Sequence, residues 1–478
     1  MTLFPNPRIL TATAFAALVL ASCAVGPKAP DATLPPSASG AFTSSAPAMT
    51  SEVARDDWWR LYDDPTLDGL VRQALAENNQ LEAATANLRA VRATLNETRS
   101  ARLPRLNGSG SALYSRQSAG SIPPGGGAPG GPQDEVETYD AGLDVSYEID
   151  LWGRVSAAIR AARADADATK AAVDILRVSI AAETARAYAD ACSANAQIAV
   201  AERTIALQSD TVGLTQRLLD AGSGNGLDTA RARSALESSR AALPPLRAQR
   251  DGALFRLATL TGRTPAEASE AARACVRPPQ LSRPIPVGDG AALLARRPDV
   301  RQAERQLAAA AARVNVAVAN LYPTVTLGGS VGATALDIAD LGESDNFRFS
   351  LGPLISWSFT NPGVSRARVE RADALTEVAL ATFDQTVLVA LQETETALAA
   401  YANELDRRTS LQAARDQAAT AAWLSRLRFD AGADSFLSVL DAERTLAGAD
   451  AQLAASDALV TTYQIGLFKA LAGGWNEG

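Results

Sequence analysis

The chain has 478 residues, a net charge of −8, no histidine and few aromatic residues. Without histidine, a histidine-ligated metal site and a histidine general base are excluded, and the acidic balance argues against a nucleic-acid partner. No glycine-rich segment lies between a predicted strand and a predicted helix, so a phosphate loop is not expected. We therefore expect no enzyme, no catalytic residue, no metal site and no cofactor.

The N-terminus has the pattern of an export signal. Residues 1–22 combine Arg8 with an apolar run that is too short to span a bilayer, as in a secretory signal peptide. The run stops at small residues before Cys23, whose thiol can be acylated, and a polar tether rich in proline and serine follows. We predict lipidation of Cys23; an ordinary signal peptide with an incidental cysteine is the alternative.

Most of the remaining chain consists of two copies of one pattern. Gly153 and Gly363 are 363 − 153 = 210 residues apart, and Gly222 and Gly432 repeat this spacing. Each copy is predicted to contain a helix, a strand hairpin and two very long helices. The expected segments are a signal peptide at 1–22, a lipidated tether and belt at 23–66, a first repeat at 67–261, an equatorial belt at 262–292, a second repeat at 293–471 and a C-terminal tail at 472–478.

Two strand hairpins are predicted, at about 103–150 and 322–359, because apolar and polar residues alternate there with a period of two. Strands of about ten residues suit a tilted membrane strand. A soluble sandwich shows the same alternation, but four strands leave nothing for a second layer. The polar positions of the strand from Thr138 include Asp140, Asp144 and Glu148.

Four strands cannot close a barrel, and open sheet edges are not tolerated in lipid. Two chains would supply eight strands, whose interior is filled by side chains, whereas three would supply twelve and leave a lumen. Geometry therefore favours a trimer. The acids Asp140, Asp144 and Glu148 would then line the water and set cation preference.

Alanine-rich helical patterns follow each hairpin. In the first copy a helix is expected from Asp150 or Leu151 to about Ala221, followed by a partner that is interrupted at Pro244-Pro245. At 1.5 Å per residue the first of these helices would be about 100 Å long. A coiled-coil scaffold is the usual interpretation of such helices. Here they enter and leave strand hairpins, which favours a helical tube that continues a membrane barrel.

Several short motifs carry a family resemblance. They are Cys23-Ala24-Val25-Gly26-Pro27, Trp58-Trp59 with Asp64-Pro65-Thr66-Leu67, Tyr147-Glu148-Ile149-Asp150-Leu151-Trp152-Gly153-Arg154, Arg296-Arg297-Pro298-Asp299-Val300-Arg301 and Val439-Leu440-Asp441-Ala442. Over nearly its whole length the chain resembles the TolC-like outer membrane factors of tripartite efflux pumps, and specifically the NodT lipoprotein branch.

The resemblance implies a mainly α protein with a membrane β-barrel. Three chains share twelve strands, and a long periplasmic helical barrel continues them. It also implies a periplasmic membrane-fusion adaptor and an inner-membrane pump of the RND type as partners, and the export of small toxic compounds or drugs. Ala24, rather than aspartate, follows the cysteine, which in such lipoproteins implies the outer membrane of a Gram-negative bacterium.

Two matching turns are predicted where the long helices end, at Gly222 and Gly432, since glycine suits a helix C-cap. The resemblance implies that these exposed turns meet the adaptor, with Gly222, Gly224, Gly432 and Ala433 as candidate docking residues.

A periplasmic gate is implied just beyond the second turn. Asp441 matches the family's gate aspartate, and Leu437 lies one helical turn earlier on the same face. Three copies of Asp441 would form an acidic ring. Arg231 occupies the equivalent position of the first copy and could pair with an acid, and Asp228 is a weaker gate candidate. Without the resemblance, a lone helical aspartate is usually just solvated.

Two further cysteines, Cys192 and Cys275, lie in a chain that we place in an oxidising compartment. Cys192 is about forty residues along its helix, roughly 60 Å from the membrane end, which is the depth expected for the belt that contains Cys275. A disulfide is predicted, with two separate thiols as the alternative.

Two other functions stay open at this point. One is the exit duct of a type I protein-secretion system. The other is a non-conducting periplasmic coiled-coil scaffold lipoprotein, which predicts no membrane strands.

Overall fold

The structure is a computed structural model. It describes residues 25–28, 30, 32–44, 48–53, 55–116, 135–281, 283–357 and 362–472. The predicted signal peptide, Cys23 and most of the predicted C-terminal tail lie outside these residues. The chain divides into two compact units, which we describe separately. The sheet unit comprises Met1–Ala32, Arg89–Ala168 and Glu304–Thr382, and the helical unit comprises Thr33–Leu88, Thr169–Ala303 and Phe383–Gly478.

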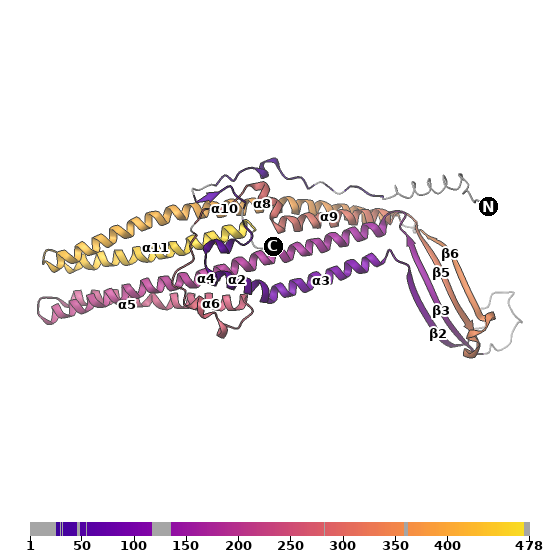
Figure 1. Ribbon diagram of the computed structural model, residues 1–478, viewed down its shortest axis with the longest axis horizontal. Helices are drawn as coiled ribbons and strands as arrows, with labels where there is room; N and C mark the ends of the chain where they lie inside the picture. Colours follow the sequence, from indigo (N-terminus) through magenta and orange to yellow (C-terminus); the bar gives the residue numbers. More distant parts are fainter. Residues whose placement is uncertain are drawn as a thin grey trace, which may run out of the picture. The chain divides into compact units, whose positions relative to one another are not determined.

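The sheet unit contains one four-stranded antiparallel sheet (Figure 1). Its strands follow the order β2 (Arg105–Ser115), β3 (Val136–Ile149), β5 (Thr324–Ala335) and β6 (Phe347–Ser356). Each predicted hairpin is present, and the two hairpins join along β3 and β5. Both belong to the residues that the period-two pattern marked as strands, so this part of the predicted fold is confirmed.

The register of the sheet gives it one apolar and one polar face. Leu143 pairs with Gly108 and Val331, and Val331 pairs with Phe349. The adjacent row is polar throughout and consists of Asn107, Asp144, Ser330 and Ser350. A slip of one residue would exchange the faces of a strand, so this register aligns the alternation of all four strands.

The apolar face of the sheet has no covering layer among the described residues. Phe349 is 79% exposed and Leu351 is 75% exposed, although both belong to the apolar face. A soluble sandwich would bury these side chains against a second sheet. The sheet therefore presents its apolar face to something outside the chain.

The helices repeat in the same order in both copies. In the first copy α2 (Pro65–Glu77) and α3 (Asn79–Ser100) precede the hairpin, and α4 (Arg154–Asp220), α5 (Gly226–Ala241) and α6 (Leu243–Leu260) follow it. In the second copy α8 (Gly290–Arg296) and α9 (Pro298–Ala319) precede the hairpin, and α10 (Pro362–Asp430) and α11 (Phe436–Ala470) follow it.

The expected proline interruption separates α5 from α6. Pro244 lies in the first turn of α6, where a missing backbone N–H costs nothing. The first long helix begins at Arg154 rather than at Asp150 or Leu151. Asp150 instead accepts hydrogen bonds from the backbone N–H groups of Val155 and Ser156, at 2.9 and 2.8 Å, and so stabilises the first turn.

The core of the helical unit lies where the short helices meet the ends of the long ones. Trp58 is fully buried in η2 (Trp58–Tyr62) and stacks on Phe468 of α11, with ring centroids 4.8 Å apart. Leu67 of α2 and Leu254 of α6 belong to the same cluster and are also fully buried. Burial of these large side chains is what holds the short helices on the long ones.

The tether and the segment after α6 form a joint belt on the helical unit. Strand β1 (Met49–Thr50) pairs in parallel with β4 (Ile285–Pro286). The Glu395 carboxylate on α10 accepts hydrogen bonds from the backbone N–H groups of Thr43 and Ser44, at 2.7 and 3.0 Å. The tether is thus bonded both to the second belt segment and to a long helix.

A disulfide joins Cys192 of α4 to Cys275 of this belt, with the two Cα atoms 5.0 Å apart. This is the pair that the sequence predicts. The link ties the belt covalently to the first long helix.

Candidate channel wall and periplasmic gate

The polar face of the sheet carries ion pairs as well as acids. Asp140 on β3 pairs with Arg348 on β6 at 2.7 Å and also accepts a hydrogen bond from Thr334 of the intervening β5, at 2.8 Å. Glu148, near the end of β3, pairs with Arg154. Two of the three predicted lumen acids are therefore neutralised by arginines of their own chain.

Asp144 differs from its two neighbours. It lies between Asn107 and Ser330 in the register, and none of the ion pairs found in the described residues involves it. The alternation predicts which face the acids share, but not that Arg348 reaches Asp140 across β5. Of the three acids, Asp144 is the one with uncompensated charge.

The Asp-Leu-Trp-Gly-Arg motif builds the corner between β3 and α4. Trp152 stacks on Tyr322 with ring centroids 4.6 Å apart, and its Nε1 donates a hydrogen bond to the Pro323 carbonyl at 2.8 Å. Together with the helix cap at Asp150, these contacts tie the exits of the two hairpins together. The motif is thus a structural corner of the sheet unit.

The two helix-ending turns have the same structure. Gly222 and Gly432 have φ values of 74° and 73°, which non-glycine residues rarely adopt. Each donates its N–H to a carbonyl three residues earlier, Leu219 or Phe429, at 2.9 Å in both cases. Gly224 and Ala433 follow in the same turns. This is the predicted C-cap geometry; a docking role for these residues stays a prediction.

The residues after the second turn point to opposite sides of α11. Phe436 and Leu440 are buried against Ala232 of α5. Leu437, by contrast, is 52% exposed, and Asp441 is exposed. The packing of α11 on α5 therefore turns the predicted gate residues outward, where they are free to meet another molecule.

The first copy has a related surface that the sequence analysis missed. Leu227 lies 437 − 210 = 227, at the position equivalent to Leu437, and it is 58% exposed. An apolar residue repeated at equivalent positions directly after both turns was the available signal. Each copy thus exposes one leucine in the first turn after its hairpin.

The candidates Asp228 and Arg231 have local partners. Asp228 accepts a hydrogen bond from the Asn225 side chain at 2.7 Å and donates its backbone N–H to the same side chain at 2.9 Å. Arg231 lies 3.7 Å from Asp228. Asp228 therefore helps to cap α5, and Arg231 has a weak ion pair one helical turn away.

A buried charged cluster close to the turns was also missed. Glu443 of α11 is 3% exposed; it pairs with Arg426 of α10 at 2.6 Å and accepts a hydrogen bond from Thr211 of α4 at 3.0 Å. Burial raises the pKa of Glu443, and Arg426 and Thr211 oppose this only in part. The cluster joins three long helices just above the predicted gate.

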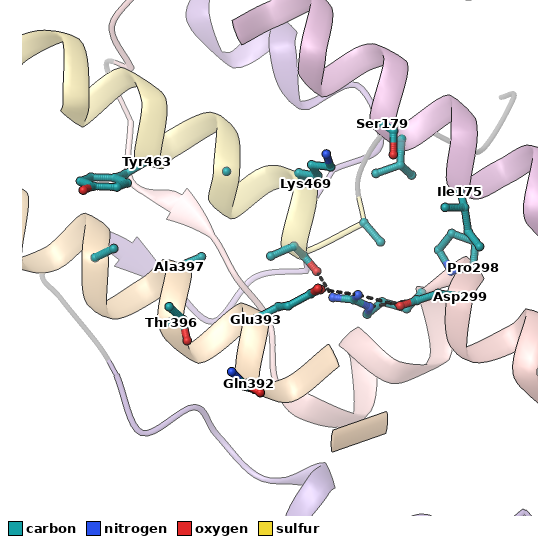
Figure 2. Close-up of a pocket in the computed structure, with 16 residues that line it drawn as sticks. Ile175, Ser179, Pro298, Asp299, Gln392, Glu393, Thr396, Ala397, Tyr463 and Lys469 are labelled. Atoms are coloured by element: carbon teal, nitrogen blue, oxygen red, sulfur yellow. Dashed lines mark hydrogen bonds and ion pairs between the residues drawn. The ribbon is translucent and has the colours of Figure 1, made fainter. Parts of the chain in front are cut away.

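A cavity of about 600 Å³ lies in the helical unit beside α4, α10 and α11 (Figure 2). On one wall the Arg297 guanidinium binds Asp299 and Glu393, at 2.7 Å each, and donates to the Ala470 carbonyl at 2.9 Å. These charges satisfy one another and leave no free group for a ligand. No cluster of metal-ligating side chains occurs in the part of the chain that the structure describes.

A two-faced antiparallel sheet followed by very long paired helices defines a class of outer-membrane channel proteins, and comparison with known proteins identifies the family. The family model for outer membrane efflux protein matches residues 70–263 and 291–473, one segment in each repeat. The chain belongs to this family.

Individual relatives agree over nearly the full length. The pyoverdine export outer membrane protein OpmQ of Pseudomonas aeruginosa is 32% identical, covering 97% of this chain and 96% of the relative. Nodulation protein T of Rhizobium leguminosarum bv. viciae is 28% identical, covering 97% and 93%. The solved outer-membrane channel OprN superposes with a TM-score of 0.87 at 34% identity, covering 95% of this chain and all of OprN.

These comparisons confirm the predicted TolC-like fold, the outer-membrane location and the function as an outer membrane efflux channel. The coiled-coil scaffold is wrong, because that alternative predicts no membrane strands. The relatives are efflux channels rather than enzymes.

Proposed function

We propose that three copies of the chain form one closed duct through the outer membrane. The observation that carries this proposal is the sheet, with an uncovered apolar face, a polar face and two edge strands. In the described sheet β2 and β6 each pair with only one neighbour. Edges of this kind are not tolerated in lipid, and twelve strands from three chains would remove them and leave a lumen.

The long helices support the same assembly. Helix α10 contains a stretch that is long and apolar enough to cross a membrane by length and composition, yet only 22% of that stretch is buried within the chain. A helical tube would cover this surface with helices of neighbouring copies. An apolar helix surface of this length needs such partners.

We propose small toxic compounds or drugs as the cargo, an inner-membrane pump of the RND type as the source, and a periplasmic adaptor that docks on the turns around Gly222 and Gly432. The name of OpmQ assigns it to pyoverdine export, which is also the export of a small organic molecule. The largely self-neutralised polar face of the sheet suits a passive duct rather than a selective binding site. Co-purification of an adaptor with the wild type, but not with a chain whose two turns are altered, would support the docking surface.

We also propose that Cys23 is acylated. Cys23→Ser should abolish incorporation of labelled fatty acid while the strands still insert. Equal labelling of the wild type and the variant would show that Cys23 is an incidental cysteine.

The gate proposal assigns Asp441 and Leu437 to the narrowest part of the duct. Like charges in a ring repel, so a closed ring of Asp441 must be held by a hydrogen bond, a cation or a base such as Arg231. Removal of the carboxylate should open this latch, while Leu437 still narrows the bore. We expect Asp441→Ala to raise single-channel conductance in planar bilayers.

Asp210→Ala is a matched control, because Asp210 is an exposed aspartate on α4 far along the chain from the turns. It should conduct like the wild type. If Asp441→Ala also conducts like the wild type while its trimer is intact, Asp441 is a solvated surface residue. If the wild-type trimer does not conduct at all, the duct proposal itself is wrong.

A further inference from the structure

A positively charged pocket lies in the sheet unit, where the tether meets α4 and α9. Its volume is about 460 Å³. Alanines of the two helices form much of its lining. Its charged lining residues are Lys28 of the tether, Arg160, Arg163 and Asp167 of α4, and Arg305 of α9, four cations and one anion.

These cations are largely uncompensated. Arg160 and Arg163 are exposed and take part in no ion pair found within the described ranges. Arg305 reaches only the adjacent Glu304, at 3.4 Å. Arg313, close by on α9, instead pairs with Asp165 of α4 at 2.5 Å. The pocket therefore keeps a net positive charge that the chain itself does not neutralise.

The pocket lies close to the ends of the strands. Arg160 comes six residues after the start of α4 and Asn315 four residues before the end of α9, which places them roughly 9 Å and 6 Å along their helices. A headgroup layer is about 5–8 Å thick on each side of the hydrocarbon core. If the strands span the bilayer, the pocket begins at the depth of lipid phosphates.

The seating of the tether leads to the same depth independently. Gly26 has a φ of +133°, and a Cβ there would lie 2.0 Å from Asn315 Oδ1, so glycine alone permits this close approach. Cys23 precedes Gly26 by three residues, which span at most about 10 Å. An acyl group on Cys23 would therefore enter the bilayer next to the pocket.

We propose that this tether pocket binds the phosphate headgroup of an anionic phospholipid. Guanidinium groups match phosphate oxygens with paired hydrogen bonds, so Arg160 and Arg163 would hold the phosphate and Lys28 would add charge. Asn315 Oδ1 is buried without a hydrogen-bond donor in the described residues, and a headgroup hydroxyl would supply one. The excess of positive charge favours a net anionic headgroup over a zwitterionic one. This inference rests on the proposed membrane orientation.

The test uses the full chain, reconstituted in phosphatidylcholine nanodiscs with a minor fraction of phosphatidylglycerol, and native mass spectrometry of the lipid that stays bound. The wild type should retain phosphatidylglycerol selectively. The double variant Arg160→Gln/Arg163→Gln should lower its apparent affinity at least about tenfold. Arg203→Gln/Arg217→Gln is the matched control, since both arginines are exposed on α4 outside the pocket and should leave retention unchanged.

Three results would overturn the inference. The first is equal retention by the wild type and the Arg160/Arg163 variant. The second is full displacement of the lipid by inorganic phosphate at the concentration of the lipid, which would identify a free-phosphate site. The third is loss of the trimer by the variant in pure phosphatidylcholine, which would show that the arginines pair with a neighbouring copy. Conductance of the same samples tests the duct separately: a conducting trimer without lipid selectivity overturns only the lipid site.

Discussion

The two repeats use the same backbone contacts with different side chains. Asn78 Nδ2 in the first repeat donates to the Leu260 carbonyl at 2.9 Å, and Arg297 in the second donates to the Ala470 carbonyl at 2.9 Å. The partner carbonyls are 470 − 260 = 210 residues apart. Both bonds satisfy a carbonyl in the last turn of a helix, which otherwise lacks a partner.

The same relation holds near the turns. Gln216 accepts from Arg233 at 2.9 Å in the first repeat, and 210 residues later Arg426 pairs with Glu443 at 2.6 Å. The contact is retained, but an amide–guanidinium hydrogen bond is replaced by a buried ion pair. The requirement to satisfy backbone groups and to hold two helices together is therefore shared, whereas the charge is particular to each repeat.

This difference predicts that equivalent substitutions will have unequal costs, most of all at Asn78 and Arg297. Arg297→Ala would leave two carboxylates without their buried partner and should lower the free energy of unfolding by about 3–5 kcal/mol. Asn78→Ala should cost only about 1–2 kcal/mol, because it removes neutral hydrogen bonds. Urea unfolding of the solubilised protein, followed by circular dichroism, measures both.

Arg263→Ala is the control, because Arg263 pairs with Glu77 on the surface, with both side chains nearly half exposed. It should cost no more than about 1 kcal/mol. Equal costs at Asn78 and Arg297 would mean that only the shared backbone bond matters.

The disulfide separates the repeats next, since Ala402 stands 210 residues after Cys192. The linked cysteines are 83 residues apart, so Cys192→Ala/Cys275→Ala should lower stability by about 2–4 kcal/mol in the chain-entropy account. The same urea experiment on reduced wild type should match the double variant. An unchanged midpoint in both would show that the belt is held by its non-covalent contacts alone.

Gly262 and Ala472 are also 210 residues apart, and both have positive φ values, 70° and 54°. Gly262→Ala should destabilise by at least about 2 kcal/mol, because its Cβ would lie 2.6 Å from the Glu77 carbonyl oxygen in an already unfavourable conformation. Ala472→Gly should stabilise by about 0.5–1 kcal/mol. Thermal melts of the two variants should shift in opposite directions; a loss of stability in both would contradict the equivalence of these helix ends.

The smallest expected effect is in the pH dependence. Because the pKa of Glu443 is raised in the folded chain, its contribution to stability is greatest below its unfolded pKa and is lost as pH rises through the folded pKa. Asp68 has the opposite sign: burial raises its pKa, but a hydrogen bond from Trp59 and the nearby Arg60 and Arg72 lower it on balance. Its contribution is present above the unfolded pKa and is lost on acidification.

Unfolding free energies of Glu443→Gln and Asp68→Asn, each compared with the wild type from about pH 3 to pH 7, should therefore show slopes of opposite sign. Parallel slopes would show that Glu443 is not held in a desolvated site.

The sequence by itself determined the elements and their repetition. Alternation with a period of two marks the strands and their faces, the 210-residue spacing marks the repeats, and Gly222 and Gly432 mark the turns. These signals are local, because a strand face or a positive φ depends on a few neighbouring residues. They also predicted the Cys192–Cys275 pair from the length of one helix.

Only the tertiary structure decided which charges meet. Arg348 neutralises Asp140 because the register places β6 two strands from β3, and Glu443 is buried because α4, α10 and α11 pack around it. The pocket around Arg160 exists because Gly26 seats the tether on α9. Such contacts join residues far apart in the chain. Their geometry depends on register and helix packing, which no local pattern encodes.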